Sequence, residues 1–301
     1  MPHIAILAHR ADRFESSGYF LRAVIDVWRK QGIHVTVVCA PEELCVADLA
    51  ILHIDLTVVP EEHLQFSTSF PRVLNGAVTD ISKRRLSANL VSPGDGYLGP
   101  VVVKTNLNCG GQREARLQDN GQAWAQLVRP LERLAPWHRR GRMTSSCYRV
   151  FDCPARVPRS VWSNPVWVVE RFLPERRGDL YCLRTWTFLG DREMNSMCCA
   201  REPIIKSSNI VSREPVAEVP DQLRRMRREL GFDYGKFDYV IVDGQVILYD
   251  ANRTPSLGAF PSQDMAPRIR HLAEGLQVFL RQERQPASCR PTACRSSASR
   301  P

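Results

Sequence analysis

The chain has 301 residues, of which 44% are hydrophobic and 24% are charged, a composition typical of a soluble globular protein with a sizeable core. No apolar run reaches the roughly 20 residues of a membrane helix, and the strand-like start Ile4–Ala8 lacks a signal-peptide core, so we expect a cytoplasmic protein. The formal net charge of +9 raises nucleic acid as a partner, but no aromatic residues are interleaved with the arginine clusters at 139–142 and 224–228, so this partner is not favoured.

The first part of the chain alternates strands with a helix. Apolar runs predict strands at 3–8, 33–39, 49–54 and 71–76. A helix is predicted over 19–30, where apolar residues recur at helical spacing. Strand, helix and strand at this spacing form a βαβ unit, which predicts a parallel sheet in an N-terminal lobe spanning 1–85. This lobe has no Gly-x-Gly-x-x-Gly sequence, so we do not expect a nicotinamide dinucleotide site in it.

A second lobe is expected over 86–165, after a short capped helix that begins near Asp80. Its strand at 101–104 ends in Lys104, directly after three valines. A lysine there needs a negative partner if it is buried, and a phosphate would suit, although the side chain could also extend to water. The following Gly110 and Gly111 either let the backbone approach phosphates or form a plain tight turn.

A third lobe is expected over 166–281. It begins with a strand at 166–174 and continues with an alternating strand at 183–191, in which Arg184 shares a face with Trp186 and Phe188. An arginine on such a face has an anionic partner, either a transferring phosphoryl group or a carboxylate in a structural salt bridge. An amphipathic helix follows at 221–230, whose arginines are predicted to form a solvated face. A closing helix is predicted at 265–280.

The most informative segment is 234–255, in which two apolar runs flank Asp243-Gly244 and predict a β-hairpin. Asp250 and Asn252 are two residues apart and therefore share a face of one strand, and Asp238 on the partner strand lies within reach of that face if the turn is tight. Two carboxylates and an amide oxygen suit a Mg²⁺ ion that carries phosphate oxygens. The alternative is the acidic, solvent-facing side of an ordinary hairpin.

Four segments in register, 99–111, 166–174, 183–191 and 234–255, resemble the signature of the ATP-grasp superfamily. The resemblance implies an α/β grasp fold, in which an N-terminal βαβ lobe precedes two lobes that sandwich ATP. It implies ATP and Mg²⁺ as cofactors, with Asp238, Asp250 and Asn252 as the metal ligands.

The resemblance also implies roles for other residues. Lys104 and Arg184 would hold phosphates during catalysis, beside Gly110 and Gly111. The strand-to-loop hinge would present backbone groups to adenine from Glu170, Arg171, Phe172 and Leu173. Lys206 and Asn209 match the basic and amide positions before the hairpin, and Glu175 or Asp179 would reach the ribose. Lys83 lies closer to Lys104 than the family's second phosphate-binding lysine does, so its role stays open.

The leading interpretation is an ATP- and Mg²⁺-dependent carboxylate–amine ligase that forms an acylphosphate on a small-molecule or peptide substrate. Asp250 stands where the ligase branches carry glutamate, whereas inositol phosphate kinases of the superfamily carry Asp-x-Asn, so a small-molecule kinase is the alternative. A nucleotide-binding module without catalysis is a third interpretation. No membrane partner is expected, and a homo-oligomer is left open.

Two features stand outside this resemblance. The ten cysteines include no Cys-x-x-Cys pair, which speaks against a structural zinc site and favours mostly reduced, buried thiols. The last segment, 282–301, consists mainly of Ser, Pro, Arg and Ala, and this composition predicts a disordered tail.

Overall fold

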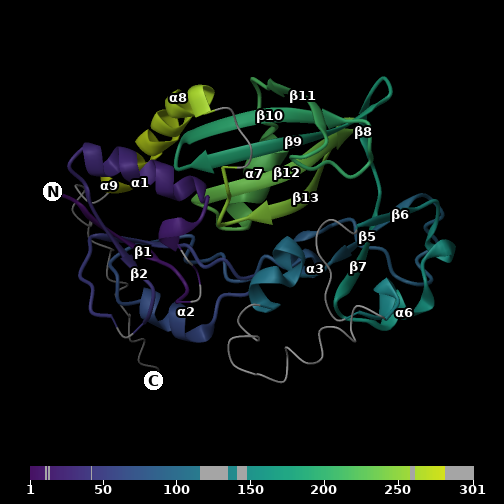
Figure 1. Ribbon diagram of the computed structural model, residues 1–301, viewed down its shortest axis with the longest axis horizontal. Helices are drawn as coiled ribbons and strands as arrows, with labels where there is room; N and C mark the ends of the chain where they lie inside the picture. The colour runs from purple at the N-terminus through teal and green to yellow at the C-terminus, as the bar shows by residue number, and fades with distance from the viewer. Residues whose placement is uncertain are drawn as a thin grey trace, which may run out of the picture.

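The computed structural model describes residues 1–10, 12, 14–41, 43–115, 135–140, 148–257 and 262–281. The segment predicted as a tail, 282–301, lies outside these residues, as does much of 112–165. The described chain forms one parallel and two antiparallel sheets with helices packed on them (Figure 1). The predicted mixed α/β class is therefore confirmed.

The N-terminal sheet has the strand order β2-β1-β3-β4 and is parallel throughout. Its strands are β1 (His3–Leu7), β2 (His34–Val38), β3 (Leu49–Leu52) and β4 (Val73–Leu74). Helix α1 (Phe20–Lys30) crosses from β1 to β2 and buries an apolar stripe that includes Val24 and Trp28, as its spacing predicts. The short elements η1 (Phe14–Ser16) and α2 (Glu61–Ser67) complete this lobe.

The C-terminal helices of the described chain pack against the N-terminal lobe. Helix α8 (Ser262–Ala273), η6 (Glu274–Leu276) and α9 (Gln277–Arg281) follow the hairpin, and α8 packs against α1 (Figure 1). The indole Nε1 of Trp28 donates a hydrogen bond to the carbonyl oxygen of Ala273 at 2.9 Å. The closing helix, which we expected in the third lobe, thus shares a core with the N-terminal sheet.

The central sheet is small and antiparallel, with the order β6-β5-β7. Its strands are β5 (Val101–Thr105), β6 (Arg149–Phe151) and β7 (Trp167–Arg171). The elements around them are α3 (Lys83–Leu86), η2 (Asn108–Gly111), η3 (Trp137–Arg139), η5 (Pro154–Arg156) and α6 (Arg159–Ser163). Strand β7, expected in the third lobe, pairs with β5 and belongs to this sheet.

The largest sheet has the order β11-β10-β9-β12-β13, with β8 paired to β9. Its strands are β8 (Glu175–Arg177), β9 (Leu180–Leu189), β10 (Arg192–Ala200), β11 (Ile210–Pro215), β12 (Tyr234–Val242) and β13 (Gln245–Asn252). The predicted hairpin is confirmed: Asp243 and Gly244 join β12 to β13 with φ of 51° and 75°, the left-handed conformations of a tight hairpin turn. Strands β10 and β11 were not predicted.

Helix α7 (Asp221–Glu229) covers one face of this sheet, and its arginines are of two kinds. Arg225 and Arg228 are exposed, as predicted. The Arg227 guanidinium instead lies 4.0 Å from the Phe188 ring centroid and donates hydrogen bonds to three backbone carbonyls. Arg224 pairs with Glu193 at 2.6 Å. Of the four arginines that we expected to be solvated, Arg225 and Arg228 are exposed, whereas Arg224 and Arg227 contact other residues of the protein.

Two of the cysteines are paired in the largest sheet. Cys182 on β9 and Cys199 on β10 lie opposite each other and form a disulfide, where we expected thiols.

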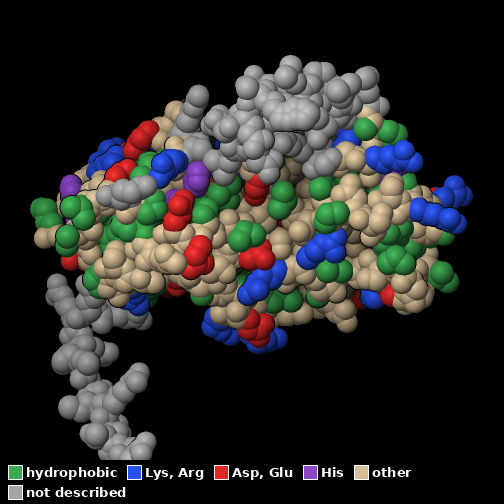
Figure 2. Space-filling model, turned by 90° about the horizontal axis from the view of Figure 1, so that it is seen from below, with side chains coloured by type: hydrophobic (Ala, Val, Ile, Leu, Met, Phe, Trp, Pro, Cys, Tyr) green, Lys and Arg blue, Asp and Glu red, His purple; other side chains and the backbone are tan. Residues whose placement is uncertain are grey.

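Within the described ranges, no helix combines the length and the apolar character that crossing a membrane requires. On the face that Figure 2 shows, the basic and acidic side chains of the described residues are interspersed.

Candidate functional site

A cavity of about 340 Å³ is lined by residues of the central sheet and of the largest sheet. Its lining combines an apolar set with a charged set. The apolar set includes Val102, Phe172, Pro174, Leu183, Ile205 and Val240, and the charged set comprises Lys83, Lys104, Lys206, Lys236, Asp238 and Asp250. A cavity with this lining can hold a ligand that is itself part apolar and part anionic.

The structure brings the three predicted metal ligands together. Asp238 on β12 lies opposite Asp250 on β13, and Asn252 follows two residues later on the same strand. All three line the cavity. Within the described chain, no three His, Cys, Asp or Glu residues form a cluster, so the donor set here is two carboxylates and an amide. Hard oxygen donors of this kind suit Mg²⁺ and not a soft metal.

A β-bulge shapes this part of the hairpin. Asp238 pairs with Asp250 and Tyr239 pairs with Leu248, so Tyr249 is an additional residue on β13. Both Tyr249 and Asp250 line the cavity, although they are consecutive, while Leu248 packs in the core on the other face. A bulge can re-aim a side chain in this way. Simple alternation of strand residues therefore could not place Tyr249.

Two lysines pair with the two aspartates. Lys83 Nζ lies 3.1 Å from Asp250 Oδ1, and Lys236 Nζ lies 3.0 Å from Asp238 Oδ2. Burial lowers the pKa of Lys83, but Asp250, through its charge and its hydrogen bond, together with Tyr148 and Glu170 raises it further, and the net pKa is raised. Lys83, whose role the sequence left open, is thus a buried cation of the site. Lys236 was missed, although its position two residues before Asp238 on a strand indicates the same face.

Asp238 retains capacity for a further cation. Burial raises the pKa of its carboxyl, and Lys236 opposes that rise. Its Oδ1 is inaccessible and has no hydrogen-bond partner among the described residues. A buried carboxylate oxygen without a partner is costly, so the arrangement fits a metal ion bound on that side of Asp238.

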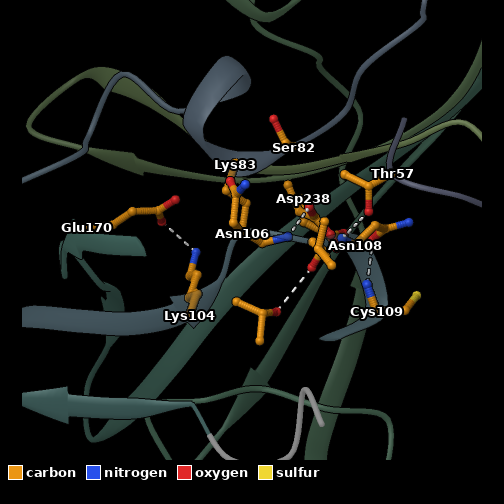
Figure 3. A network of polar contacts seen from close by, with 12 residues as sticks. Thr57, Ser82, Lys83, Lys104, Asn106, Asn108, Cys109, Glu170 and Asp238 are labelled. Atoms are coloured by element: carbon orange, nitrogen blue, oxygen red, sulfur yellow. Dashed lines mark hydrogen bonds and ion pairs between the residues drawn. The ribbon is translucent and has the colours of Figure 1, made fainter. Parts of the chain in front are cut away.

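Lys104 points into the protein and does not extend to water. Its Nζ contacts Glu170 Oε2 (Figure 3), at a distance of 2.7 Å. The side chains of Lys104 and Glu170 are 9% and 0% exposed. The same Nζ lies 4.4 Å from the centroid of the Tyr249 ring, within cation–π range. Lys104 lines the cavity, so it can exchange Glu170 for an anionic ligand. Glu170 acts here through its side chain, which the hinge interpretation did not foresee.

The backbone N–H groups of the hinge are engaged. Arg171 N–H donates to the carbonyl of Asn89, and Phe172 N–H donates to that of Pro100. Leu173 N–H donates to the Tyr249 hydroxyl at 2.9 Å, and that hydroxyl donates to the Leu173 carbonyl at 2.9 Å. Phe172 lines the cavity with its side chain, whereas the exposed Arg171 lies over the Tyr97 ring.

The structure does not bring Arg184 to the cavity. Arg184 does share a face of β9 with Trp186 and Phe188, but that face packs under α7, away from the cavity. Its guanidinium donates to both carboxylate oxygens of Glu175 at 2.7–3.0 Å. The structural salt bridge, which was the alternative interpretation, is therefore what the structure contains.

The same observation removes Glu175 from a ribose-binding position, because its carboxylate also accepts the backbone N–H of Ile241. Asp179 is exposed and is not among the described residues that line the cavity. Neither acidic residue that we expected at the ribose is therefore part of the site.

The glycine loop and the segment before β11 contribute in part. Gly110 and Gly111 are buried with φ of 69° and 71°, and the lining comes from Asn108 and Cys109 just before them. Lys206 lines the cavity as expected. Asn209 does not; its side chain accepts the Lys206 N–H and donates to Glu202 and to the Ile204 carbonyl, so it braces the loop that carries Lys206.

Comparisons with known proteins find no family model and no curated protein that matches the chain. Among solved structures, the chain is similar to a RimK domain ATP-grasp protein from Sphaerobacter thermophilus, with 14% identity over 92% of this chain and 98% of that one and a TM-score of 0.45. A RiPP-associated ATP-grasp ligase from Chryseobacterium gregarium, in complex with ADP and a leader and core peptide, matches with 12% identity over 93% and 97% and a TM-score of 0.48. D-alanine–D-alanine ligase from Bacillus anthracis complexed with ATP matches with 13% identity over 94% and 100% and a TM-score of 0.40.

Proposed function

We propose that the protein is an ATP- and Mg²⁺-dependent ligase of the ATP-grasp type that joins a carboxylate to an amine. The observation that carries this proposal is the lining of one cavity by Asp238, Asp250 and Asn252 together with four lysines and an apolar wall. Oxygen ligands suit Mg²⁺, ammonium groups suit phosphates, and the apolar wall suits a base.

The metal would be held by Asp238, Asp250 and Asn252. The unpartnered Oδ1 of Asp238 supports this placement. When bound, Mg²⁺ neutralises phosphate charge and so stabilises phosphoryl transfer. Lys83 and Lys236, which now pair with the aspartates, would then turn their ammonium groups toward the phosphate oxygens.

Lys104 would bind phosphate in exchange for Glu170. The pair is short and buried, yet Lys104 also borders the cavity, so an anionic ligand can compete with the carboxylate. We assign to Lys236 the phosphoryl-binding role first expected of Arg184, because Lys236 lies on the cavity face beside Asp238. Lys206, carried by its braced loop, would add a further cation at the phosphates.

The reaction has two transfers. A substrate carboxylate oxygen attacks the γ-phosphorus, and ADP leaves with the electron pair of the broken P–O bond to give an acylphosphate. An amine nitrogen then attacks the acyl carbon, phosphate leaves with the C–O electron pair, and the nitrogen loses a proton. Positioning and charge neutralisation are what the described residues supply for this. The substrate class is a small molecule or a peptide.

One observation favours a second candidate, a kinase that phosphorylates a small molecule and stops there. Asp250 is shorter than the glutamate of the ligase branches, and it is held by Lys83 at 3.1 Å. A non-catalytic nucleotide-binding module is disfavoured because all three metal-ligand positions line the cavity.

A screen for ADP release with pooled carboxylates and amines tests the proposal, with mass spectrometry of the products. A new amide, and a hydroxamate when hydroxylamine replaces the amine, support the ligase, whereas a stable phosphoester supports the kinase. Asp238→Asn should reduce turnover by about a hundredfold, while Asp243→Asn, the same change at the hairpin turn away from the cavity, should leave it unchanged. The absence of any thermal shift with any nucleotide at millimolar concentration would rule out both enzymes.

A further inference from the structure

Tyr249 is the bulge residue of β13, and its hydroxyl holds the hinge. We propose that the backbone N–H and C=O of Leu173, which lies between the lining residues Phe172 and Pro174, bind the base, and that in the nucleotide-free protein the Tyr249 hydroxyl occupies them, so that its displacement limits the affinity for adenine nucleotides. The inference rests on the proposed function, and it assigns a role to a side chain that neither strand alternation nor the metal hairpin explains.

The hydrogen bonds of the hinge single out Leu173. The N–H groups of Arg171 and Phe172 donate hydrogen bonds to the backbone carbonyls of Asn89 and Pro100. Backbone acceptors of this kind cannot rotate away as a side chain can. Pro174 has no N–H. Only the Leu173 N–H among these hinge donors is held by a side chain, and a side chain can rotate away while the backbone stays.

The hydroxyl of Tyr249 matches the chemistry of a purine edge. It accepts from Leu173 N–H and donates to Leu173 C=O, both at 2.9 Å. Adenine presents the same pair of functions on one edge, as the N1 acceptor and the N6 amino donor. Burial raises the pKa of Tyr249, so the hydroxyl keeps the proton that it donates.

The geometry also predicts which part of a nucleotide the hydroxyl affects. The Tyr249 ring lies under Lys104 at 4.4 Å, and that contact does not involve the hydroxyl. Replacing Tyr249 with Phe therefore keeps the ring beneath Lys104 in the free protein, but it removes the two hydrogen bonds that hold the side chain at Leu173, so the ring moves aside more easily when a base binds. In the free variant the Leu173 groups lose their partner, whereas in the bound variant the base supplies it, so the bound state becomes relatively more favourable.

The test measures binding of three probes, ADP, adenosine and tripolyphosphate, to the full-length protein by calorimetry. Tyr249→Phe should bind ADP and adenosine about tenfold more tightly, which is about 1.4 kcal/mol, and tripolyphosphate as the parent does. Tyr239→Phe is the matched control, because it removes a buried hydroxyl, bonded to Asn195, from the face of the same sheet that is turned away from the cavity. It should leave all three affinities unchanged.

Hydrogen exchange at the Leu173 amide provides a second readout that does not depend on affinity. Exchange should be faster in free Tyr249→Phe than in the free parent, and equal in the two once ADP is bound. The inference is overturned if Tyr249→Phe binds ADP no more tightly than the parent, if tripolyphosphate tightens equally, or if Leu173 exchange is the same in the two free proteins. If ADP binds to neither the parent nor any variant, the proposed function fails and the inference falls with it.

Discussion

The buried pair of Lys104 and Glu170 offers a quantitative test of phosphate binding. Glu170→Gln keeps the size of the side chain and removes its charge, which leaves the Lys104 ammonium beside a neutral amide. Removing one partner of a buried ion pair costs about 3–5 kcal/mol. The face of the Tyr249 ring, 4.4 Å from Lys104 Nζ, offsets part of this, so we expect a loss near the lower end of that range. At about 2 °C per kcal/mol for a protein of this size, the melting temperature should fall by roughly 6 °C.

Nucleotide should reverse this loss. Under the proposed function, Lys104 of the parent exchanges Glu170 for phosphate, whereas in Glu170→Gln the phosphate would replace a partner that is already missing. Mg²⁺–ATP should therefore raise the melting temperature of the variant by more than it raises that of the parent. Differential scanning fluorimetry over an ATP series measures both shifts.

Glu175→Gln is the matched control for this prediction. It breaks the pair with Arg184, which lies on the far face of the largest sheet, so it should lower the melting temperature without any additional recovery in ATP. Equal ATP shifts for the parent and Glu170→Gln would refute the exchange of Glu170 for phosphate at Lys104.

Three further outcomes are expected. Asp238→Asn and Asp250→Asn should each reduce ATP turnover by about a hundredfold while the far-ultraviolet circular dichroism stays unchanged, and parent-like turnover would exclude them as metal ligands. Burial lowers the pKa of His53 to about 3, so the unfolded chain binds a proton that the folded chain does not, and stability should fall from pH 6.5 toward 3 by about 1.4 kcal/mol per pH unit. Urea unfolding of His53→Phe should show a flatter pH profile over this window, and an unchanged profile would assign the acid sensitivity elsewhere. Arg227→Ala should lower the melting temperature by several degrees and Arg225→Ala should not, since only Arg227 packs on Phe188; equal effects would contradict that packing.

The hairpin shows how far sequence reasoning reaches. Asp243-Gly244 specifies the turn, and the turn fixes the register as far as Tyr239 opposite Leu248. The bulge at Tyr249 then brings Asp238 opposite Asp250. Alternation also placed Arg184 on the face of Trp186 correctly, but it does not say which face of a sheet borders a cavity. That choice depends on how α7 and the central sheet pack, which is a property of contacts between distant segments.

Other residues of the site depend on irregularities that have no local signal. The bulge interrupts the alternation of side chains between the two faces of β13, so Tyr249 borders the cavity beside Asp250. Nothing in the sequence around Tyr249 marks it as the extra residue. The disulfide between Cys182 and Cys199 follows from the pairing of β9 with β10, and β10 was not predicted. Lys236 differs from these, because its spacing from Asp238 was sufficient to place it on the cavity face.

The contact of α1 with α8 has a consequence for how the protein is made. Trp28 and its partner Ala273 are separated by 245 positions, so the ribosome needs about 12–50 s after Trp28 before it adds the residue that covers it. During that interval the apolar stripe of α1 has no helix to pack against. The N-terminal lobe therefore completes its core only at the end of synthesis, and a fragment that stops before α8 should aggregate or recruit chaperones.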